Sequence, residues 1–145
     1  MSAMKLSNLG EVVIKFFEEL VLVAYLDSGG IWTCGWGHTG VDIKKGTTCT
    51  PGSAEIWFLG DVKEAVDAVN SLVKVELKQI QFDALTSFTF NDGVEALRGS
   101  TLLKLVNEGQ IEYAGAEFLK WVHVGGAVNK GLVKRRTLEQ ALFLS

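Results

Sequence analysis

The chain has 145 residues, of which 48% are hydrophobic and 21% are charged, and its formal net charge is −3. That length fits one domain with a single core, and the hydrophobic content excludes a mainly disordered protein. One proline and two cysteines exclude collagen-like and disulfide-dense scaffolds. Residues 1–128 carry 10 basic and 16 acidic side chains, whereas residues 129–145 carry four basic and one acidic. An acidic body with a basic tail argues against a general nucleic-acid binder.

The N-terminal third of the chain predicts a helix followed by a β-hairpin. Apolar residues recur at helical spacing across residues 8–19, with Asn8 as the expected N-cap. The turn sequence at residues 27–30, Asp-Ser-Gly-Gly, then separates two apolar runs over residues 23–26 and 31–36. Such a turn between apolar runs is typical of a hairpin.

The remaining two thirds predict helices. Thr50 and Pro51 are suited to be the N-cap and first residue of a long helix over residues 51–72. Glycines separate four further expected helices, over residues 77–91, 100–107, 110–123 and 130–143. The sequence therefore predicts a mainly helical α+β fold, with a small N-terminal lobe, a connecting helix and a helical C-terminal lobe. Within this single domain we expect the small α+β lobe at about residues 13–50 and the connecting helix at about 51–72. The helical lobe is expected at about 73–145, and the N-terminal helix packs with it. A ligand site is expected in the cleft between the lobes.

Signals for membrane insertion, export and disulfide formation are weak. The longest uncharged apolar run near the N-terminus is residues 20–26, whereas a spanning helix needs about 20 residues. No export signal with a cleavage site is recognised, so we expect a soluble protein without stable membrane association. Cys34 and Cys49 lack the CxxC spacing of a metal or redox site. Isolated buried thiols are favoured over a disulfide, which would need an oxidising compartment.

Three polar residues around the hairpin form a candidate catalytic site. Glu18 is expected at the end of the first helix, Asp27 at the hairpin turn and Thr33 on the second strand. A helix end that leads directly into a tight hairpin brings such side chains around one opening. Glycoside hydrolysis needs two carboxyl groups, one protonated and one ionised, on opposite sides of the bond. A nearby threonine hydroxyl can hydrogen-bond the attacking water.

The spacing alone leaves a structural interpretation open for each of the three residues. Glu18 fits a solvated carboxylate at a helix end, Asp27 a turn-forming residue, and Thr33 a β-branched strand residue. The wider sequence favours the catalytic interpretation, because it resembles a known enzyme family in several separate blocks.

The segment around these residues resembles the phage-type lysozymes, the endolysins of glycoside hydrolase family 24. The family signature is a Glu, eight residues, an Asp (sometimes Cys), five residues, then a Thr, and Glu18, Asp27 and Thr33 match it. The resemblance continues in family order through further blocks and covers nearly the whole chain. These blocks are residues 32–39, 81–93, 100–103, 116–123 and 131–136.

The resemblance implies a two-lobe lysozyme fold and a muramidase activity. Such an enzyme hydrolyses the β-1,4 bond between N-acetylmuramic acid and N-acetylglucosamine in bacterial peptidoglycan, which causes cell lysis. Glu18 would be the general acid, Asp27 and Thr33 would position and activate the water, and the configuration would be inverted. Neither a metal nor an organic cofactor is implied. We expect a monomer in the host cytoplasm, which depends on a separate holin-type protein to reach the cell wall.

Weaker expectations concern residues beside this site. Asn91 resembles the family's cleft-facing amide, with a helix C-cap as the alternative role. Ser100 is expected to touch substrate, with an N-cap role as the alternative. In the family, a histidine at the position of His38 tends to pair with an aspartate at the position of Asp61, and we expect a structural ion pair there.

The basic C-terminal segment and a departure from the family pattern also bear on the site. Arg135 or Arg136 is expected to reach back towards Glu18, and the alternative is a solvated basic face that attracts the anionic cell wall. Glu19 stands where the family usually has glycine. Only Glu18 keeps the family spacing to the hairpin residues, so we assign the acid to Glu18.

Three other functions compete with the muramidase hypothesis. A lytic transglycosylase cleaves the same bond with an acid but without hydrolytic water, and the presence of Asp27 and Thr33 favours hydrolysis. A non-catalytic peptidoglycan-binding module would not need the intact Glu18. A purely structural helical protein is disfavoured by the ordered blocks of resemblance.

Overall fold

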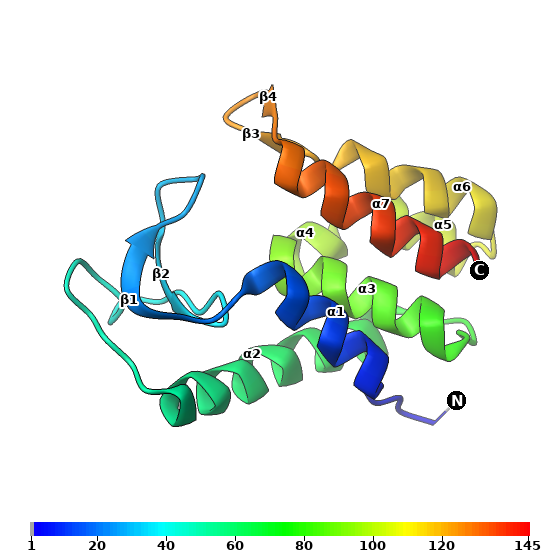
Figure 1. Cartoon of the computed structure of the whole chain (residues 1–145). Helices are drawn as coiled ribbons and strands as arrows, with labels where there is room; N and C mark the ends of the chain where they lie inside the picture. Colours follow the sequence, from blue (N-terminus) through cyan, green and yellow to red (C-terminus); the bar gives the residue numbers. More distant parts are fainter. Residues whose placement is uncertain (1) are drawn as a thin grey trace.

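The computed structural model describes residues 2–145. A β-hairpin lies at one end of the molecule and most helices pack at the other, with the long helix α2 running between the two ends (Figure 1). In chain order the elements are α1 (Asn8–Glu18), β1 (Val21–Leu26), β2 (Trp32–Gly35), α2 (Pro51–Leu72), α3 (Gln79–Asp92), α4 (Val94–Arg98), α5 (Thr101–Asn107), α6 (Ile111–Glu117), the 3₁₀ helix η1 (Phe118–Lys120), β3 (His123–Val124), β4 (Ala127–Val128) and α7 (Lys130–Leu144). The predicted mainly helical α+β fold with an N-terminal hairpin is confirmed.

The N-cap of helix α1 lies one residue before the expected position. Ser7 is the N-cap, and its hydroxyl accepts a hydrogen bond from the backbone N–H of Gly10 at 3.1 Å. The prediction that Asn8 caps the helix is therefore wrong, because Asn8 already lies in the first turn. The Ser7 side chain is itself held by the Asp83 carboxylate on α3, which fixes the start of α1 against the helical end.

The hairpin forms around the predicted turn at residues 27–30. Strands β1 and β2 pair antiparallel, with Tyr25 opposite Thr33 and Leu26 opposite Trp32. The backbone N–H of Asp27 donates to the carbonyl of Ile31 at 2.9 Å and closes the turn. Facing pairs in such a ladder have closely spaced side chains, so Tyr25 and Thr33 occupy one face of the hairpin.

Helix α2 has the bounds that the sequence predicts. The Thr50 hydroxyl accepts from the backbone N–H of Ser53 at 3.1 Å, and Pro51 occupies the first helical position. Both signals are local, since an N-cap needs only a side-chain oxygen and Pro51 lacks the N–H that would be unsatisfied there.

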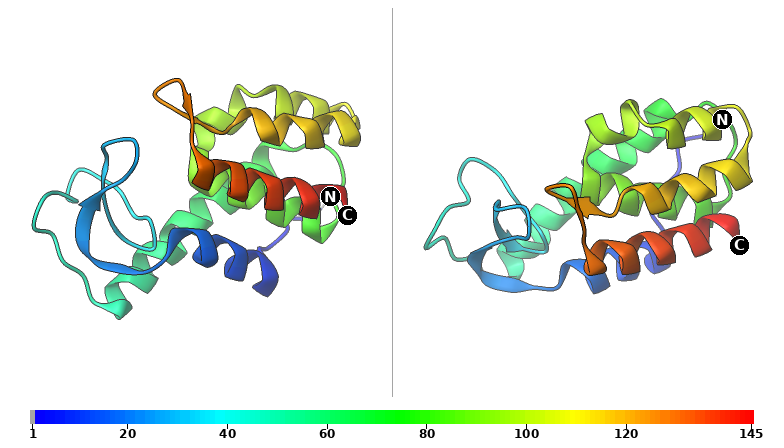
Figure 2. Two further views of the ribbon diagram at one scale, coloured as in Figure 1. Left: turned by 45° about the horizontal axis from the view of Figure 1, so that its top comes forward. Right: turned by 90° about the horizontal axis from the view of Figure 1, so that it is seen from above.

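Helix α3 is the centre of the helical end. It contacts α1, α2, α4 and α7, and α6 lies beside α7 across the same end (Figure 2). The core around α3 consists of buried apolar side chains from several helices. These include Val69, Phe82, Leu85, Phe88, Leu97, Leu102, Val106, Phe118 and Phe143, with Trp121 packed against them. Phe88 meets Phe118 and Trp121 edge to face, with ring centroids 5.8 and 5.2 Å apart.

The C-terminal half differs from the expected helices in two details. The helix expected over residues 110–123 ends earlier, since α6 and η1 stop at Lys120 and the short strands β3 and β4 follow. Gly125 and Gly126, with φ of +57° and +83°, form the turn between these strands. A two-glycine sequence is equally compatible with the end of a helix and with a hairpin turn. The backbone pairing of His123 with Val128 shows that these glycines form a hairpin turn. The short helix α4 was also not predicted.

The two cysteines lie together beside the hairpin. Both thiols are free, as expected, but they are not isolated, because their sulfur atoms lie 3.4 Å apart. Burial raises the pKa of the Cys49 thiol to about 11, and the adjacent Cys34 thiol adds to this shift. Within residues 2–145, no group of three or more His, Cys, Asp or Glu side chains is arranged to hold a metal ion. No helix of this described part is long and apolar enough to cross a membrane.

Candidate functional site

Glu18 ends α1 and points its carboxylate between two other parts of the chain. Its Oε2 accepts a hydrogen bond from Arg135 Nη1 of α7 at 2.5 Å, and its side chain is 15% exposed. On the other side it lies against the loop after β2. A Cβ added at Gly37 would come within 2.2 Å of Glu18 Oε1, and Gly37 also has a φ of +77°. This position therefore requires glycine both for space and for backbone conformation.

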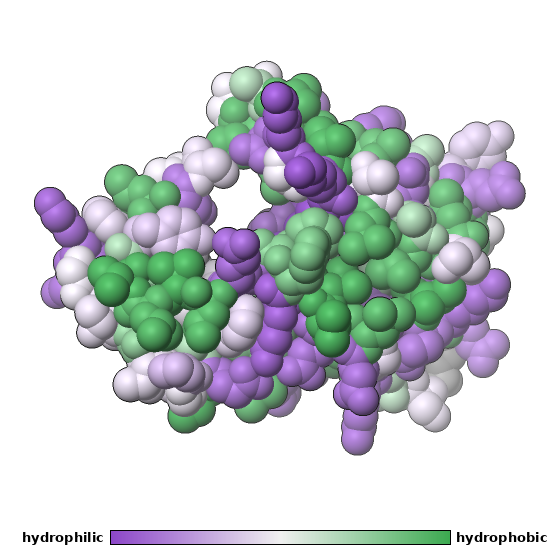
Figure 3. Space-filling model, viewed as in Figure 1, coloured by the Kyte–Doolittle hydropathy of each residue, from purple (hydrophilic) through white to green (hydrophobic). Residues whose placement is uncertain are grey.

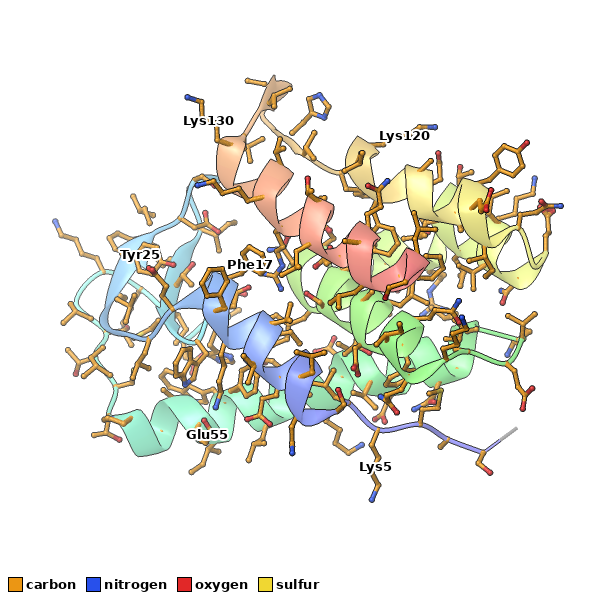
Figure 4. The ribbon with its side chains drawn as sticks, turned by 45° about the vertical axis from the view of Figure 1, so that its right-hand side comes forward. Lys5, Phe17, Tyr25, Glu55, Lys120 and Lys130 are labelled. Atoms are coloured by element: carbon orange, nitrogen blue, oxygen red, sulfur yellow. The ribbon has the colours of Figure 1, made fainter. Side chains whose placement is uncertain are left out.

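The hairpin faces Glu18 through Tyr25. Burial raises the pKa of Tyr25, and the negative charges of Glu18, Asp27 and Glu19 raise it further. Figure 4 shows Tyr25 on β1 and Phe17 at the end of α1, beside the segment that joins them. The charges of Glu18 on α1 and Asp27 at the hairpin turn thus act on the same side chain of β1.

Asp27 combines a structural role with a free oxygen. Its Oδ1 accepts hydrogen bonds from the backbone N–H groups of Gly29 and Ile31, each at 2.8 Å. Within residues 2–145 no donor is bonded to Oδ2. The interpretation as a turn-forming residue and the interpretation as a site carboxylate are therefore compatible, since each uses a different oxygen.

Thr33 lies on β2 with 4% of its surface exposed. Its hydroxyl donates a hydrogen bond to the carbonyl of Ile31 at 2.9 Å. The hydroxyl hydrogen is therefore occupied, and the oxygen retains lone pairs that can accept from a water molecule. Its cross-strand partner is Tyr25, so Thr33 lies on the same short hairpin as Asp27.

Arg135 is held in place through all three of its guanidinium nitrogens. Nη1 donates to Glu18, Nε to Glu139 Oε2 at 3.2 Å, and Nη2 to the carbonyl of Ser87 at 3.2 Å. The guanidinium also lies over the Phe17 ring, 5.5 Å from its centroid. The contact that sequence analysis expected from Arg135 or Arg136 is thus made by Arg135. Glu139 was missed, although its spacing of four residues from an arginine on a helix is a recognisable signal.

Arg136 is completely buried and turns away from Glu18. Its Nε donates to the carbonyl of Trp121 at 3.0 Å, Nη1 donates to Glu139, and Nη2 donates to Asn91. Nη2 also lies 2.6 Å from Asp92 Oδ2, close enough for an ion pair, although that oxygen accepts no aligned hydrogen bond. Burial raises the pKa of Asp92 to about 6, against the opposing effect of the Arg136 charge.

The structure shows the local surroundings of Asn91 and Ser100, and their expected contacts with substrate stay predictions. Asn91 is exposed on α3 and is not a C-cap, because the helix continues to Asp92 and is capped by Gly93. The Ser100 hydroxyl accepts from the N–H of Leu103 at 3.0 Å and donates to the carbonyl of Leu97 at 2.7 Å. Ser100 is therefore the N-cap of α5, with its hydroxyl occupied inside the helical end.

His38 and Asp61 lie in contact, as the sequence led us to expect. His38 Nδ1 lies 2.8 Å from Asp61 Oδ2, and the imidazole stacks on the Trp57 ring with centroids 4.7 Å apart. Asp61 also lines a cavity of about 180 Å³, together with Gly37 and Phe90. The shared Gly37 places this cavity next to Glu18.

An opening separates the β1–β2 hairpin from the β3–β4 turn in the space-filling view (Figure 3). Helix α1, which ends at Glu18, leads into the β1–β2 hairpin, and α7, which carries Arg135, follows β4.

The chain is similar to known proteins over almost its full length. A sequence model of the family described as phage lysozyme matches residues 15–139. The endolysin of Bacillus phage B103 is 44% identical over 144 residues, which is 98% of this chain and 55% of that protein. The endolysin of Salmonella phage P22 is 41% identical over 146 residues, 98% of this chain and 99% of that protein. This chain thus spans about half the length of the B103 protein and nearly all of the P22 protein.

A solved structure has the same fold. The endolysin from Escherichia coli O157:H7 phage FAHEc1 superposes with a TM-score of 0.87 at 39% sequence identity. The superposition covers 99% of this chain and 96% of that one.

Proposed function

The chain belongs to the phage lysozyme family, and we propose that it is a muramidase. It hydrolyses the β-1,4 bond between N-acetylmuramic acid and N-acetylglucosamine in bacterial peptidoglycan. One observation carries the proposal. The Glu18 carboxyl is held between Arg135 and the Gly37 backbone, and it faces a hairpin that carries Asp27 and Thr33.

Glu18 acts as the general acid. Arg135 donates to Oε2, so Oε1 carries the proton that is transferred to the leaving oxygen of the glycosidic bond. The contact with Gly37 holds this oxygen in one direction, which keeps the donor aligned with the bond.

Asp27 and Thr33 hold the attacking water. Asp27 Oδ2 and the lone pairs of Thr33 Oγ1 are both acceptors, so together they bind the two hydrogens of one water molecule. The oxygen lone pair of that water then points away from both residues and towards the sugar. As the water attacks, it transfers one proton to Asp27 Oδ2 while Glu18 gives its proton to the leaving oxygen, and attack opposite the leaving group inverts the configuration of the anomeric carbon.

Product analysis tests the reaction type. Purified peptidoglycan is digested and the fragments are examined by mass spectrometry and proton NMR. A hydrolase with inversion gives reducing N-acetylmuramic acid ends that first appear as the α-anomer. Fragments that end in 1,6-anhydromuramic acid, lighter by one water, would instead identify a lytic transglycosylase. Binding to the cell wall without any cleavage would identify a non-catalytic module.

The cellular setting follows from the same proposal. The enzyme acts as a monomer that reaches the wall from the host cytoplasm through a membrane opened by a separate holin-type protein. A single chain is sufficient for the reaction, since it supplies Glu18, Asp27 and Thr33. Expression in bacterial cells tests this setting. Lysis is expected only after the membrane is permeabilised, and prompt lysis without permeabilisation would contradict it.

A further inference from the structure

A buried carboxylate without an assigned role lies behind the site. Glu139 on α7 has no exposed surface, and three side chains donate hydrogen bonds to it. Ser87 Oγ lies 2.6 Å and Arg135 Nε lies 3.2 Å from its Oε2, and Arg136 Nη1 donates to its Oε1. Arg135 and Arg136 are neighbours in sequence and both are buried, which is costly unless a negative charge lies between them.

The position of Glu139 fixes the direction of Arg135. A guanidinium is planar, so hydrogen bonds on the Nε and Nη2 edges determine where Nη1 points. Glu139 and Ser87 occupy those two edges, and the remaining Nη1 meets Glu18. If the Nε partner were lost, the guanidinium could rotate while still bonded to Ser87, and Glu18 would lose its fixed partner.

Glu139 also shares the positive charge that Glu18 experiences. Arg135 from α7 forms an ion pair with Glu18, and Tyr25 on the hairpin is near enough for the Glu18 charge to raise its pKa. The charges of Asp27 and Glu19 act on the same phenol. Among residues 2–145, Arg135 makes the only ion pair with Glu18. A carboxylate on the far side of the same guanidinium weakens the attraction between Arg135 and an ionised Glu18.

We infer that Glu139 is a positioning residue for Glu18: it aims the Arg135 guanidinium at the acid and offsets part of the guanidinium's positive charge. The inference rests on the proposed role of Glu18 as general acid. A purely structural Glu139 would instead neutralise the two arginines, and its replacement would lower stability without changing the pH response of the reaction.

The test uses Glu139→Gln, which keeps the shape of the side chain and removes its charge. Folding is checked by circular dichroism, and the rate of peptidoglycan clearance is measured from pH 4 to pH 9. We expect the basic limb of the pH–rate profile to move down by about one pH unit. In the variant no negative charge at residue 139 offsets the Arg135 charge, so Arg135 favours the ionised form of Glu18 more strongly. The matched control is Ser87→Ala, which removes a donor to Glu139 without changing its charge. Its basic limb should stay where it is in the wild type.

A second readout does not depend on activity. Carboxyl carbon NMR of the wild type and Glu139→Gln follows the titration of Glu18 and Asp92 directly. The Glu18 midpoint should move down with the basic limb. The pKa of Asp92 should fall below about 6, because the Glu139 charge is one of the factors that raise it. If the wild type proves inactive, the proposed function fails while the NMR titration still decides the electrostatic part of the inference.

Glu139→Asp separates direction from charge, and it carries the test if Glu139→Gln does not fold. The shorter carboxylate keeps its charge but cannot reach both guanidinium groups. We expect kcat to fall at least about fivefold at unchanged KM, with the basic limb in place. A folded Glu139→Gln with an unchanged basic limb and unchanged Glu18 titration would overturn the inference, as would a Glu139→Asp variant with wild-type kcat.

Discussion

Glu19 is in a backbone conformation that suits glycine better than glutamate. Its φ is +55° and its ψ is 152°, and it is the only non-glycine residue with positive φ within residues 2–145. A residue with a Cβ in this region costs about 1–3 kcal/mol. The Glu19 side chain is exposed, and in the described part of the chain it forms no ion pair that would offset this cost.

Glu19→Gly should therefore stabilise the protein. Relief of the backbone strain contributes about 1–3 kcal/mol, and the greater freedom of glycine in the unfolded chain removes about 0.5–1 kcal/mol of this. At the middle of both ranges the net gain is about 1 kcal/mol in the free energy of unfolding. For a chain of this length that corresponds to a rise in Tm of about 3–4 °C.

Thermal unfolding followed by circular dichroism at pH 7 measures this change. Glu19→Ala is the matched control, because it removes the same carboxylate and keeps the Cβ. The strain argument predicts that Glu19→Ala leaves Tm within about 1 °C of the wild type. Equal gains in both variants would refute the argument and attribute the effect to charge repulsion with Glu18. A lower Tm for Glu19→Gly would refute it as well.

Three further predictions follow from contacts and pKa values. Gly37→Ala places a Cβ 2.2 Å from Glu18 Oε1 and strains a backbone with a φ of +77°. The rate of cell-wall clearance should therefore fall at least about 100-fold, and the free energy of unfolding should fall by about 1–2 kcal/mol. A near wild-type rate would show that the contact with Gly37 does not hold the Glu18 carboxyl. The raised pKa of Asp92, about 6, means that the folded state binds the proton more tightly than the unfolded state. Its stabilising contribution, about 3 kcal/mol, is therefore complete below about pH 4 and is lost as the pH rises through about 6. In urea unfolding, the free energy of unfolding of Asp92→Asn should lack this decrease between pH 4 and pH 6. An unchanged decrease in the variant would assign the pH dependence to another group. With a pKa of about 11, Cys49 should react with iodoacetamide about 100-fold more slowly at pH 7.5 than in the urea-unfolded chain, and equal rates would contradict the burial of this thiol.

The elements with strong local signals could be predicted from the sequence. Thr50 and Pro51 set the start of α2 through an N-cap and a first-turn proline, which depend on neighbouring residues only. The turn at residues 27–30 is likewise determined by Asp27 and its glycines. The β3–β4 hairpin could not be predicted, because two glycines serve a helix stop equally well and only tertiary pairing distinguishes the two.

The candidate site shows the same limit. The order of helix, turn and second strand that places Glu18, Asp27 and Thr33 could be predicted, since a helix followed by a hairpin is determined by local signals, and their catalytic roles stay predictions. The strain at Glu19 and the role of Gly37 depend on the path of the backbone, which no side-chain pattern specifies. The spacing of Glu139 from Arg135 indicates a pair on one helix, but its burial against Ser87 depends on the packing of α7 on α3.

The most direct test of the proposed mechanism compares Glu18→Gln with Glu19→Gln in a turbidity assay on purified peptidoglycan. Both substitutions neutralise a carboxylate at the end of α1, but only the first removes the proposed proton donor. With folding verified by circular dichroism, we expect Glu18→Gln to lose at least about 100-fold in clearance rate and Glu19→Gln to retain most of it. Activity retained by Glu18→Gln, or lost only in Glu19→Gln, would contradict the assignment of the general acid.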